Sequence, residues 1–396
     1  MFEKLKKLIW RAEDPGTEDN RTIRETDPAA RALSPRQIRD RFRGCLVGGA
    51  VGDALGYEVE FISEEKIFAR FGPGGIRDYV YHNGLARISD DTQMTMFTAC
   101  GLLRAAALGA DPVACIADAY RDWYNTQFNA YKTFNRKGIT TWLMYVPEIY
   151  AARAPGNTCL NAIYMGCHGS VAKPINNSKG CGGVMRTAPA GLFCRSSGSA
   201  EDAALLGAEA AALTHGHEMG YIPGAMLAYI VRQAACGETE TLKDAVTESA
   251  EAMRKLFPEA KTLPDFLKLM ERAVALAESK ESDLDAIHKL GAGWVGDEAL
   301  AIAVYCALKY HDDFEKAMIV AVNHKGDSDS TGAICGNILG AWRGLSGIPG
   351  KFLMNLELKA ELLELADDLY RGCPDGKDPD YARAWKGKYV DVTYRA

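Results

Sequence analysis

Two stretches of this chain share an unusual spacing of glycines: residues 44–56 read GCLVGGAVGDALG, and residues 332–344 read GAICGNILGAWRG. In each stretch four glycines recur every fourth residue, which places them on one face of a helix. Glycine costs about 1 kcal/mol in a helix relative to alanine, so the spacing needs a physical reason. Close approach of two backbones is such a reason. Because Asp53 and Arg343 are charged, we expect two contacting core helices rather than membrane helices. A phosphate-binding loop is the weaker alternative, since residues 44–56 lack the glycine order and the lysine of such loops.

The chain from Ser34 onward has a helical pattern throughout. Ser34, Pro35 and Gln37 form a typical helix start, with a serine cap, a proline at the first position and a glutamine at the third. Strand-like alternation is scarce, and no repeat of 20–50 residues is found. The sequence therefore predicts one compact all-α domain over residues 36–396. Further helices are predicted at Gln93–Ala107, Pro112–Thr126, Ala200–Leu213, Tyr221–Ala235, Leu242–Leu256, Leu263–Ser279, Asp297–Tyr310, Thr331–Leu345 and Lys351–Leu369.

Residues 1–35 differ from the rest. Residues 12–31 are polar, carry both charge signs and show no apolar period, which indicates a flexible arm or linker. Before them, residues 2–9 place apolar side chains at helical spacing, typical of either a short amphipathic helix or a frayed terminus. Residues 1–43 hold eleven basic and eight acidic side chains, a net of +3. We expect residues 1–35 to be a flexible N-terminal arm that could bind an acidic partner.

The composition excludes several classes of protein. The 396 residues are 47% hydrophobic and 25% charged, so the chain is neither disordered nor collagen-like. A net charge of −6 argues against a nucleic-acid-binding role. The eleven cysteines form no CxxC pair, which favours free thiols over a zinc ribbon or a disulfide framework. With no signal-peptide-like or membrane-spanning apolar run, we expect a soluble cytoplasmic protein.

Two acidic motifs precede apolar helices: Ser89-Asp90-Asp91-Thr92 and Asp327-Ser328-Asp329-Ser330-Thr331. Helix capping explains either motif alone. Together, four carboxylates at two helix starts would repel one another unless a cation compensated them. Carboxylate and hydroxyl ligands select Mg²⁺, Mn²⁺ or Ca²⁺ over zinc or copper, and two such ions could share a bridging carboxylate. The matched glycine helices are the reason to expect that the two motifs meet.

Six segments together resemble the ADP-ribosylglycohydrolase family, which includes the ADP-ribosylarginine hydrolases and the dinitrogenase-reductase-activating glycohydrolases. The resemblance covers roughly residues 36–370 and leaves the N-terminal arm outside. It implies a compact all-helical fold with two Mg²⁺ or Mn²⁺ ions at its centre. The segments are GCLVGGAVGDALGYEVEF, SDDTQMTM, KGCGGVMRTAPAGL, THGHEMGY, GWVGDEALAIAVYC and GDSDSTGAICGNILGA.

The resemblance also implies roles for single residues in and around the metal centre. Glu60, with Glu58 as its neighbour, matches an acid that in some members gates the metal site or contacts the ribose. Asp53 is expected to hold helix and loop together. The positions that match metal ligands, with serine where threonine is common in the family, are Ser89, Asp90, Asp91, Asp327, Asp329 and Ser330.

On the substrate side, residues 179–186 resemble the loop around the ADP-ribose phosphates, where glycines let backbone N–H groups approach. Arg186 is expected to contact a phosphate or to form a salt bridge under the loop. His215 is expected either on the ligand side or in the core. Tyr221 and Trp294 could cover the adenine or ribose, or belong to the core. The full set of predicted substrate-binding residues is Glu58, Gly180, Cys181, Gly182, Gly183, Met185, Arg186, His215, Tyr221 and Trp294.

These matches lead to a functional expectation: metal-dependent hydrolysis of the N-glycosidic bond of ADP-ribosylated arginine on proteins. Asp90 or Asp91, with Glu60, would manage the protons. Cys181, where many relatives have asparagine, and residues 214–221 favour the arginine-specific branch. The partner would be an ADP-ribosylated protein, and the N-terminal arm could block an ADP-ribosyltransferase toxin. The alternatives are another ADP-ribosyl linkage (serine, O-acetyl-ADP-ribose, nucleic acid) or a non-catalytic relative that binds ADP-ribose or a partner. The presence of all four matched aspartates favours an enzyme.

Overall fold

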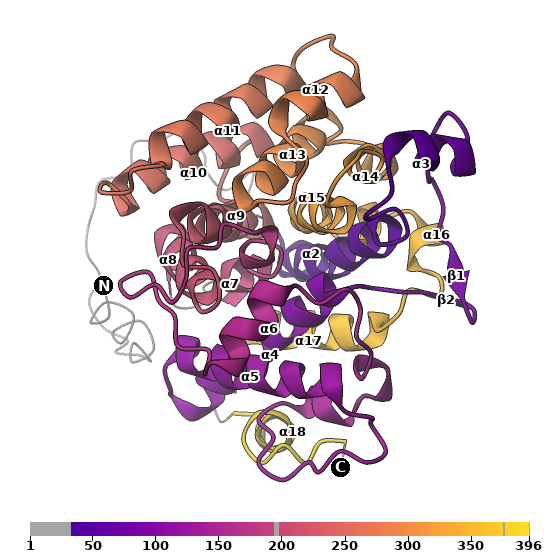
Figure 1. Ribbon diagram of the computed structural model, residues 1–396. Helices are drawn as coiled ribbons and strands as arrows, with labels where there is room; N and C mark the ends of the chain where they lie inside the picture. Colours follow the sequence, from indigo (N-terminus) through magenta and orange to yellow (C-terminus); the bar gives the residue numbers. More distant parts are fainter. Residues whose placement is uncertain (1–32, 194–197, 375–376, 396) are drawn as a thin grey trace.

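The computed structural model describes residues 33–193, 198–374 and 377–395 of the chain. Nearly all regular structure in this part is helical (Figure 1), which confirms the predicted all-α fold. The α-helices are α2 (Pro35–Gly56), α3 (Glu64–Phe71), α4 (Asp90–Leu108), α5 (Pro112–Phe128), α6 (Asn157–Tyr164), α7 (Ala188–Phe193), α8 (Ala200–Ala212), α9 (Glu218–Cys236), α10 (Leu242–Leu256), α11 (Leu263–Ala277), α12 (Asp283–Leu290), α13 (Gly296–Lys309), α14 (Phe314–Val322), α15 (Ser328–Arg343), α16 (Gly350–Leu353), α17 (Lys359–Arg371) and α18 (Pro379–Tyr389).

Shorter elements connect these helices. A hairpin of two-residue strands, β1 (Tyr81–His82) and β2 (Leu85–Ala86), pairs antiparallel with Tyr81 opposite Ala86. Turns of 3₁₀ helix occur at η2 (Trp142–Tyr145), η3 (Pro147–Ile149), η4 (Cys181–Gly183) and η5 (Leu345–Gly347).

The glycine-rich helices α2 and α15 lie side by side in the middle of the molecule, as predicted (Figure 1). They run antiparallel, with Gly48 against Gly336 and Gly52 against Gly332. A Cβ added to Gly336 would lie 2.0 Å from the Gly48 carbonyl oxygen, and one added to Gly52 would lie 1.9 Å from that of Gly332. No side chain fits at this contact, so the two backbones touch directly. The pairing brings the C-terminal end of α2 beside the N-terminal end of α15.

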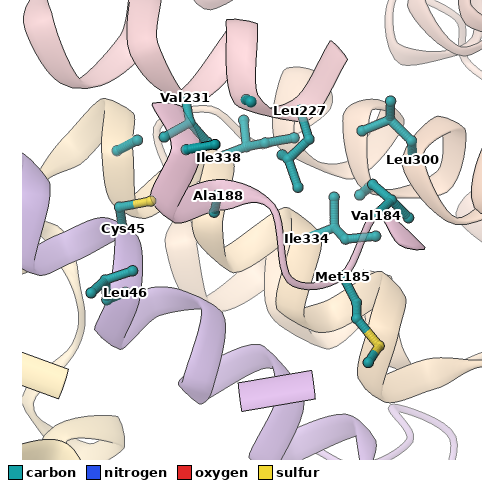
Figure 2. Packing of buried hydrophobic residues seen from close by; sticks show 14 of the residues in the cluster. Cys45, Leu46, Val184, Met185, Ala188, Leu227, Val231, Leu300, Ile334 and Ile338 are labelled. Atoms are coloured by element: carbon teal, nitrogen blue, oxygen red, sulfur yellow. The ribbon is translucent and has the colours of Figure 1, made fainter. Parts of the chain in front are cut away.

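The other helices cover this central pair. Helices α9, α13, α14 and α17 pack against α2, α15 or both, while α8 packs on α9 and α5 on α4. Figure 2 shows part of the resulting core, where side chains from α2, α7, α9, α13 and α15 meet those of the segment after η4. The labelled residues there are Cys45, Leu46, Val184, Met185, Ala188, Leu227, Val231, Leu300, Ile334 and Ile338.

Most predicted helices form within a few residues of their expected ends, and Leu242–Leu256 matches α10. The prediction of one helix over Lys351–Leu369 is wrong, because α16 and α17 are separate. Between them Asn355 and Leu358 have φ angles of 55° and 57°, outside the right-handed helical region. The Ala86 N–H donates to the Asn355 carbonyl at 2.9 Å, so this backbone pairs with strand β2. Tertiary hydrogen bonding therefore overrides local helix propensity here.

The start of α2 at Pro35 confirms the predicted helix start. Ser34 Oγ accepts from the Gln37 N–H at 3.3 Å, and Gln37 Oε1 accepts from the Ser34 N–H at 2.9 Å. The predicted arm lies outside the described residues as far as residue 32. The described cysteines are free thiols, as expected. Among the described helices, none has the length and apolar character needed to cross a bilayer.

Candidate active site and metal centre

Asp53, near the C-terminal end of α2, holds the first acidic motif in place. Its carboxylate accepts from the Ser89 N–H at 2.9 Å and the Thr92 N–H at 3.0 Å, and also from the Thr92 hydroxyl. These bonds satisfy the free N–H groups at the start of α4, so the helix begins at Asp90 rather than after the motif. Burial raises the pKa of Asp53 to about 6 although the hydrogen bonds from Thr92 and Ser89 oppose the shift. Asp53 thus joins helix and loop, as expected.

The second motif forms the start of α15 and meets the first. Asp327 caps the helix by accepting from the Ser330 N–H at 3.2 Å, and Asp329 lies in the first turn. The Ser330 hydroxyl donates to Asp91 Oδ2 at 2.8 Å. This bond joins residues 239 positions apart and brings the two acidic helix starts together. The antiparallel pairing places the start of α15 beside the C-terminal end of α2, where Asp53 holds the first motif.

Glu60, in the turn that follows α2, completes an acidic cluster. One carboxylate oxygen from each of Glu60, Asp327 and Asp329 lies within 4.8 Å of the others. Glu60 Oε2 is buried and has no hydrogen-bond partner among the described residues. Burial, and then the charges of Asp327 and Asp90, raise the pKa of Glu60 to about 9. Burial likewise raises the pKa of Asp90, Asp91 and Asp329 well above the usual value.

These features fit a hard divalent cation such as Mg²⁺ or Mn²⁺. The donor set is carboxylate and hydroxyl oxygen, and one buried oxygen lacks a partner that a cation would supply. A cation would also offset the burial and the mutual repulsion that together raise the carboxyl pKa values.

The cluster forms one wall of a cavity of about 350 Å³. The glycine loop at η4 and the start of α6 supply much of the remaining lining. The cavity is lined by Glu60, Phe61, Asp90, Asp91, Ala154, Gly156, Asn157, Thr158, Cys159, Gly180, Cys181, Gly182, Met185, His215, Trp294, Asp327, Asp329 and Ser330.

Cys181 links the glycine loop to the acidic cluster. Its thiol donates to Asp327 Oδ2 at 2.7 Å. Burial, together with Asp327 and Asp91, raises the pKa of this thiol well above its usual range, so it stays protonated and acts as a donor. The Cys181 N–H donates to the Trp294 carbonyl at 3.3 Å, which fixes the loop against the segment before α13.

His215 closes the cavity behind the glycine loop. The side chain is 2% exposed, and burial followed by the charge of Arg186 lowers its pKa to about 3, so the imidazole is neutral. Nδ1 lies 2.8 Å from the Thr214 hydroxyl, which itself accepts from Arg186. When the Thr214 hydroxyl donates its hydrogen bond to Nδ1, Nδ1 acts as the acceptor and the ring proton is on Nε2. A Cβ built on Gly180 would lie 3.3 Å from Nε2, so that donor faces the loop.

Residues 34–379 match the family model described as ADP-ribosylglycohydrolase. The chain belongs to the ADP-ribosylglycohydrolase family. It is 25% identical over 357 residues to ADP-ribosylarginine hydrolase Tri1 of Pseudomonas putida, covering 88% of this chain and 82% of that one. It is 25% identical over 331 residues to the ADP-ribosyl-[dinitrogen reductase] glycohydrolase of Rhodospirillum rubrum, covering 82% and 92%.

Other relatives carry different names. ADP-ribosylhydrolase ARH3 of Danio rerio is 24% identical over 373 residues, covering 87% of this chain and 92% of that one. A solved structure titled "ADP-ribosylglycohydrolase-related protein complex" superposes with a TM-score of 0.59 and 27% identity, covering 85% of this chain and 99% of that one. The family supports hydrolysis of ADP-ribosyl linkages, while relatives of similar identity differ in the linkage or protein they are named for.

Within this glycohydrolase, Arg186 lies away from the cavity lining. Its side chain is fully buried, 4.6 Å from the ring centroid of Tyr120, and it donates to the sulfur atoms of Met94 and Cys159. Neither of the two expected roles describes it, because no described carboxylate pairs with it and no open surface reaches it. Its position indicates that it supports the loop and orients Thr214 beneath His215.

Four more predicted site residues lie behind the cavity wall. Ser89 is fully buried, and its hydroxyl accepts from the Asp91 N–H at 3.2 Å. Glu58 pairs with His82 of strand β1. Gly183 packs on α9, where an added Cβ would lie 2.0 Å from the Gly220 carbonyl oxygen. Tyr221 is buried, with its ring centroid 5.9 Å from that of Phe257.

The structure also brings residues into the cavity that the sequence did not single out: Phe61, Ala154, Gly156, Asn157, Thr158 and Cys159. Five of them form the entry to α6. The Gly156 N–H donates to Asp90 Oδ2 at 3.3 Å, and the Asp90 N–H donates to the Arg153 carbonyl at 3.0 Å. One local signal in the sequence points to this segment. Residues 154–158 read APGNT, which is typical of a turn followed by a helix start.

Proposed function

We propose that this glycohydrolase cleaves the N-glycosidic bond between ADP-ribose and an arginine side chain of a modified protein, in a reaction that depends on Mg²⁺ or Mn²⁺. The observation that carries the proposal is the joining of both acidic motifs, through Ser330 and Asp91, beside a glycine loop in one cavity. Support for arginine comes from Cys181 and the segment 214–221, which resemble the arginine-specific branch. A relative named ADP-ribosylarginine hydrolase adds to it.

The cavity offers groups for each part of such a substrate. The residues that would hold two divalent cations are Ser89, Asp90, Asp91, Asp327, Asp329 and Ser330, with Glu60 closing the site. Bound cations would polarise the ribose hydroxyls and fix the sugar. The Gly180 and Cys181 N–H groups already donate to Ser178 and Trp294. The Gly182 N–H and the neutral His215 would therefore face the diphosphate.

Hydrolysis adds water to C1 of the ribose and breaks the C1–N bond, so the guanidine must leave protonated. Asp91 is held by Ser330, whereas Asp90 accepts one longer bond from the Gly156 N–H at 3.3 Å. We therefore assign the proton transfer to Asp90, with Glu60 as the second acid at the cavity. Both carboxyls line the cavity and are mostly enclosed by protein, which strengthens their electrostatic response to the charge that develops in the transition state.

The deciding experiment measures release of free ADP-ribose from an ADP-ribosyl-arginine protein, with Mg²⁺ or Mn²⁺ and with EDTA. Asp329→Asn is the inactive comparison, and an ADP-ribosyl-serine peptide is the linkage control. We expect metal-dependent release from arginine that is lost in the variant. Release from the serine peptide alone would show that the enzyme cleaves the serine linkage and not the arginine linkage. No release from either by folded, metal-loaded protein would leave a role in binding ADP-ribose or a partner.

We further propose that residues 1–35 bind and block an ADP-ribosyltransferase toxin. Part of the local basic excess is already used, because Arg39 and Arg43 both pair with Asp367 of α17. An acidic partner would therefore rely mainly on basic residues that precede α2. Deleting residues 1–32 should preserve hydrolysis and abolish inhibition of an arginine-specific ADP-ribosyltransferase. Equal inhibition by the full and shortened chains would contradict this role.

A further inference from the structure

We infer that the stacked rings of Phe61 and Trp294 form a platform for the guanidinium group of the modified arginine. This inference rests on the proposed arginine specificity and names the residues that would recognise the leaving group. The two ring centroids are 5.4 Å apart with an interplanar angle of 23°. Phe61 is 72% exposed and Trp294 is 41% exposed, so both keep open ring surface although they line the cavity.

Both rings belong to segments that lie next to the acidic cluster. Phe61 directly follows Glu60, and its φ of 60° lies in the left-handed region, which bulky residues rarely adopt. Trp294 lies two residues after Ala292, whose carbonyl accepts from the Asp327 N–H at 2.9 Å. The platform therefore neighbours Glu60 in the chain, and a backbone hydrogen bond links its second segment to Asp327. Strain of this kind collects at ligand-binding positions, where the fold holds a side chain outward.

The location matches the leaving group better than the adenine. If the cluster holds the ribose whose C1–N bond breaks, the group attached to C1 lies directly beside it. The adenine is separated from that ribose by the diphosphate and a second ribose, so it belongs farther along the cavity. The exposed aromatic rings beside the acidic cluster can bind a planar cation. The guanidinium of the modified arginine is such a cation, and it connects the ribose to the protein substrate outside the cavity.

A protonated guanidinium is the group that suits both features of this edge. Arginine stacks on aromatic faces through cation–π attraction, and its charge complements the nearby carboxylates. A serine linkage presents a neutral oxygen and gains nothing from either. The platform would thus favour arginine-linked over serine-linked substrate without contacting ADP-ribose itself.

The test compares Phe61→Leu and Trp294→Leu with variants that keep an aromatic face, Phe61→Tyr and Trp294→Phe. Tyr164→Leu is the matched control, because Tyr164 is 79% exposed at the end of α6 and lies outside the cavity lining. For the leucine variants we expect kcat/KM on an ADP-ribosyl-arginine peptide to fall roughly 3- to 30-fold, mainly through a higher KM. The aromatic variants should retain most of the activity, and calorimetric affinity for free ADP-ribose should not change.

Two results would overturn the platform while leaving the proposed function intact. Unchanged arginine kinetics in both leucine variants would show that the rings do not hold the guanidinium. A parallel loss of ADP-ribose affinity would show that they hold the nucleotide instead. Failure of wild-type protein to cleave arginine-linked substrate at all would remove the proposed specificity, and the platform with it.

Discussion

Asp53 shows how one side chain can set the geometry of the first acidic motif without lining the cavity. It binds the backbone of Ser89 and Thr92 and so fixes the direction in which α4 presents its first-turn carboxylates. A charge-assisted bond of this kind contributes about 1.5–3 kcal/mol, and loss of a group that orients metal ligands commonly costs about 10- to 100-fold in affinity or activity.

We expect Asp53→Asn to lower the free energy of unfolding by roughly 2 kcal/mol and to reduce metal-dependent activity. The reason is that the new amide N–H₂ would face the N–H group of Ser89 or Thr92, and two donors cannot form a hydrogen bond. Asp122→Asn is the matched control, since Asp122 is also buried and accepts from the Thr140 N–H at 2.7 Å, far along the chain from either acidic motif. Chemical denaturation and metal titration of both variants provide the measurement. Equal metal affinities in the two variants would contradict the positioning role of Asp53.

His215 provides a pH prediction at the same scale. Its pKa is about 3 in the folded protein, against about 6.5 in an unfolded chain. Between these values the unfolded chain binds the extra proton, so stability is lost as pH falls. From pH 7 to pH 5 the wild type should lose about 2 kcal/mol more than His215→Gln. Comparing the two proteins by denaturation at both pH values cancels the opposite effect of the carboxyls with raised pKa. Parallel stability curves would show that His215 accepts a proton in the folded state.

At the scale of elements, the contact of α2 with α15 sets the distance between the two acidic motifs. A Cβ at position 336 would lie 2.0 Å from a backbone oxygen of α2, so the helices would have to separate. Gly350, at the start of α16, has no atom within 4 Å of an added Cβ.

We expect Gly336→Ala to destabilise the protein by about 3 kcal/mol and to weaken metal binding, since the motifs would move apart. Gly350→Ala should change stability by no more than about 0.5 kcal/mol. Thermal unfolding of both variants, with a metal titration of Gly336→Ala, checks this. A Gly336→Ala protein as stable as wild type would show that the helices can separate without cost.

At the scale of the whole molecule, the candidate metal centre draws its residues from the turn after α2 and the starts of α4 and α15, so a bound cation should stabilise the entire fold. At 100 times its dissociation constant a cation adds about 2.7 kcal/mol. Because unfolding entropy grows with chain length, each kcal/mol raises the Tm of a domain of this size by only about 1–2 °C. The raised carboxyl pKa values mean that the metal-free folded chain binds more protons than the unfolded chain. Its stability therefore falls as pH rises, and the cation effect should be larger at pH 8 than at pH 6.

Asp329→Asn separates this effect from general ion binding. We expect the variant to lose the rise in Tm with Mg²⁺ or Mn²⁺. It should also melt higher than wild type in EDTA, because it removes a buried acid that must take up a proton or remain charged beside Asp91 and Asp327. Scanning calorimetry with and without EDTA provides both values. An unaltered metal response in the variant would place the cation elsewhere.

Much of this architecture follows from local sequence. The four-residue glycine spacing predicts the α2–α15 contact because a helix places every fourth residue on one face. Ser34 and the two acidic motifs mark helix starts, since their side chains cap free N–H groups. The family resemblance rests on the same segments, and it identified most of the acidic cluster and the glycine loop as parts of one site.

Tertiary structure alone decided the remaining features. Local propensity favours one helix over residues 351–369, but pairing with strand β2 divides it. Arg186 has the charge to bind a phosphate, yet packing around Tyr120 encloses it completely. Phe61 and Trp294 are 233 positions apart and become neighbours only when the α2 turn and the α13 entry meet at the cavity. Periodicity and capping act over a few residues, so the sequence determines them directly, whereas burial and ring contacts depend on which distant segments the fold brings together.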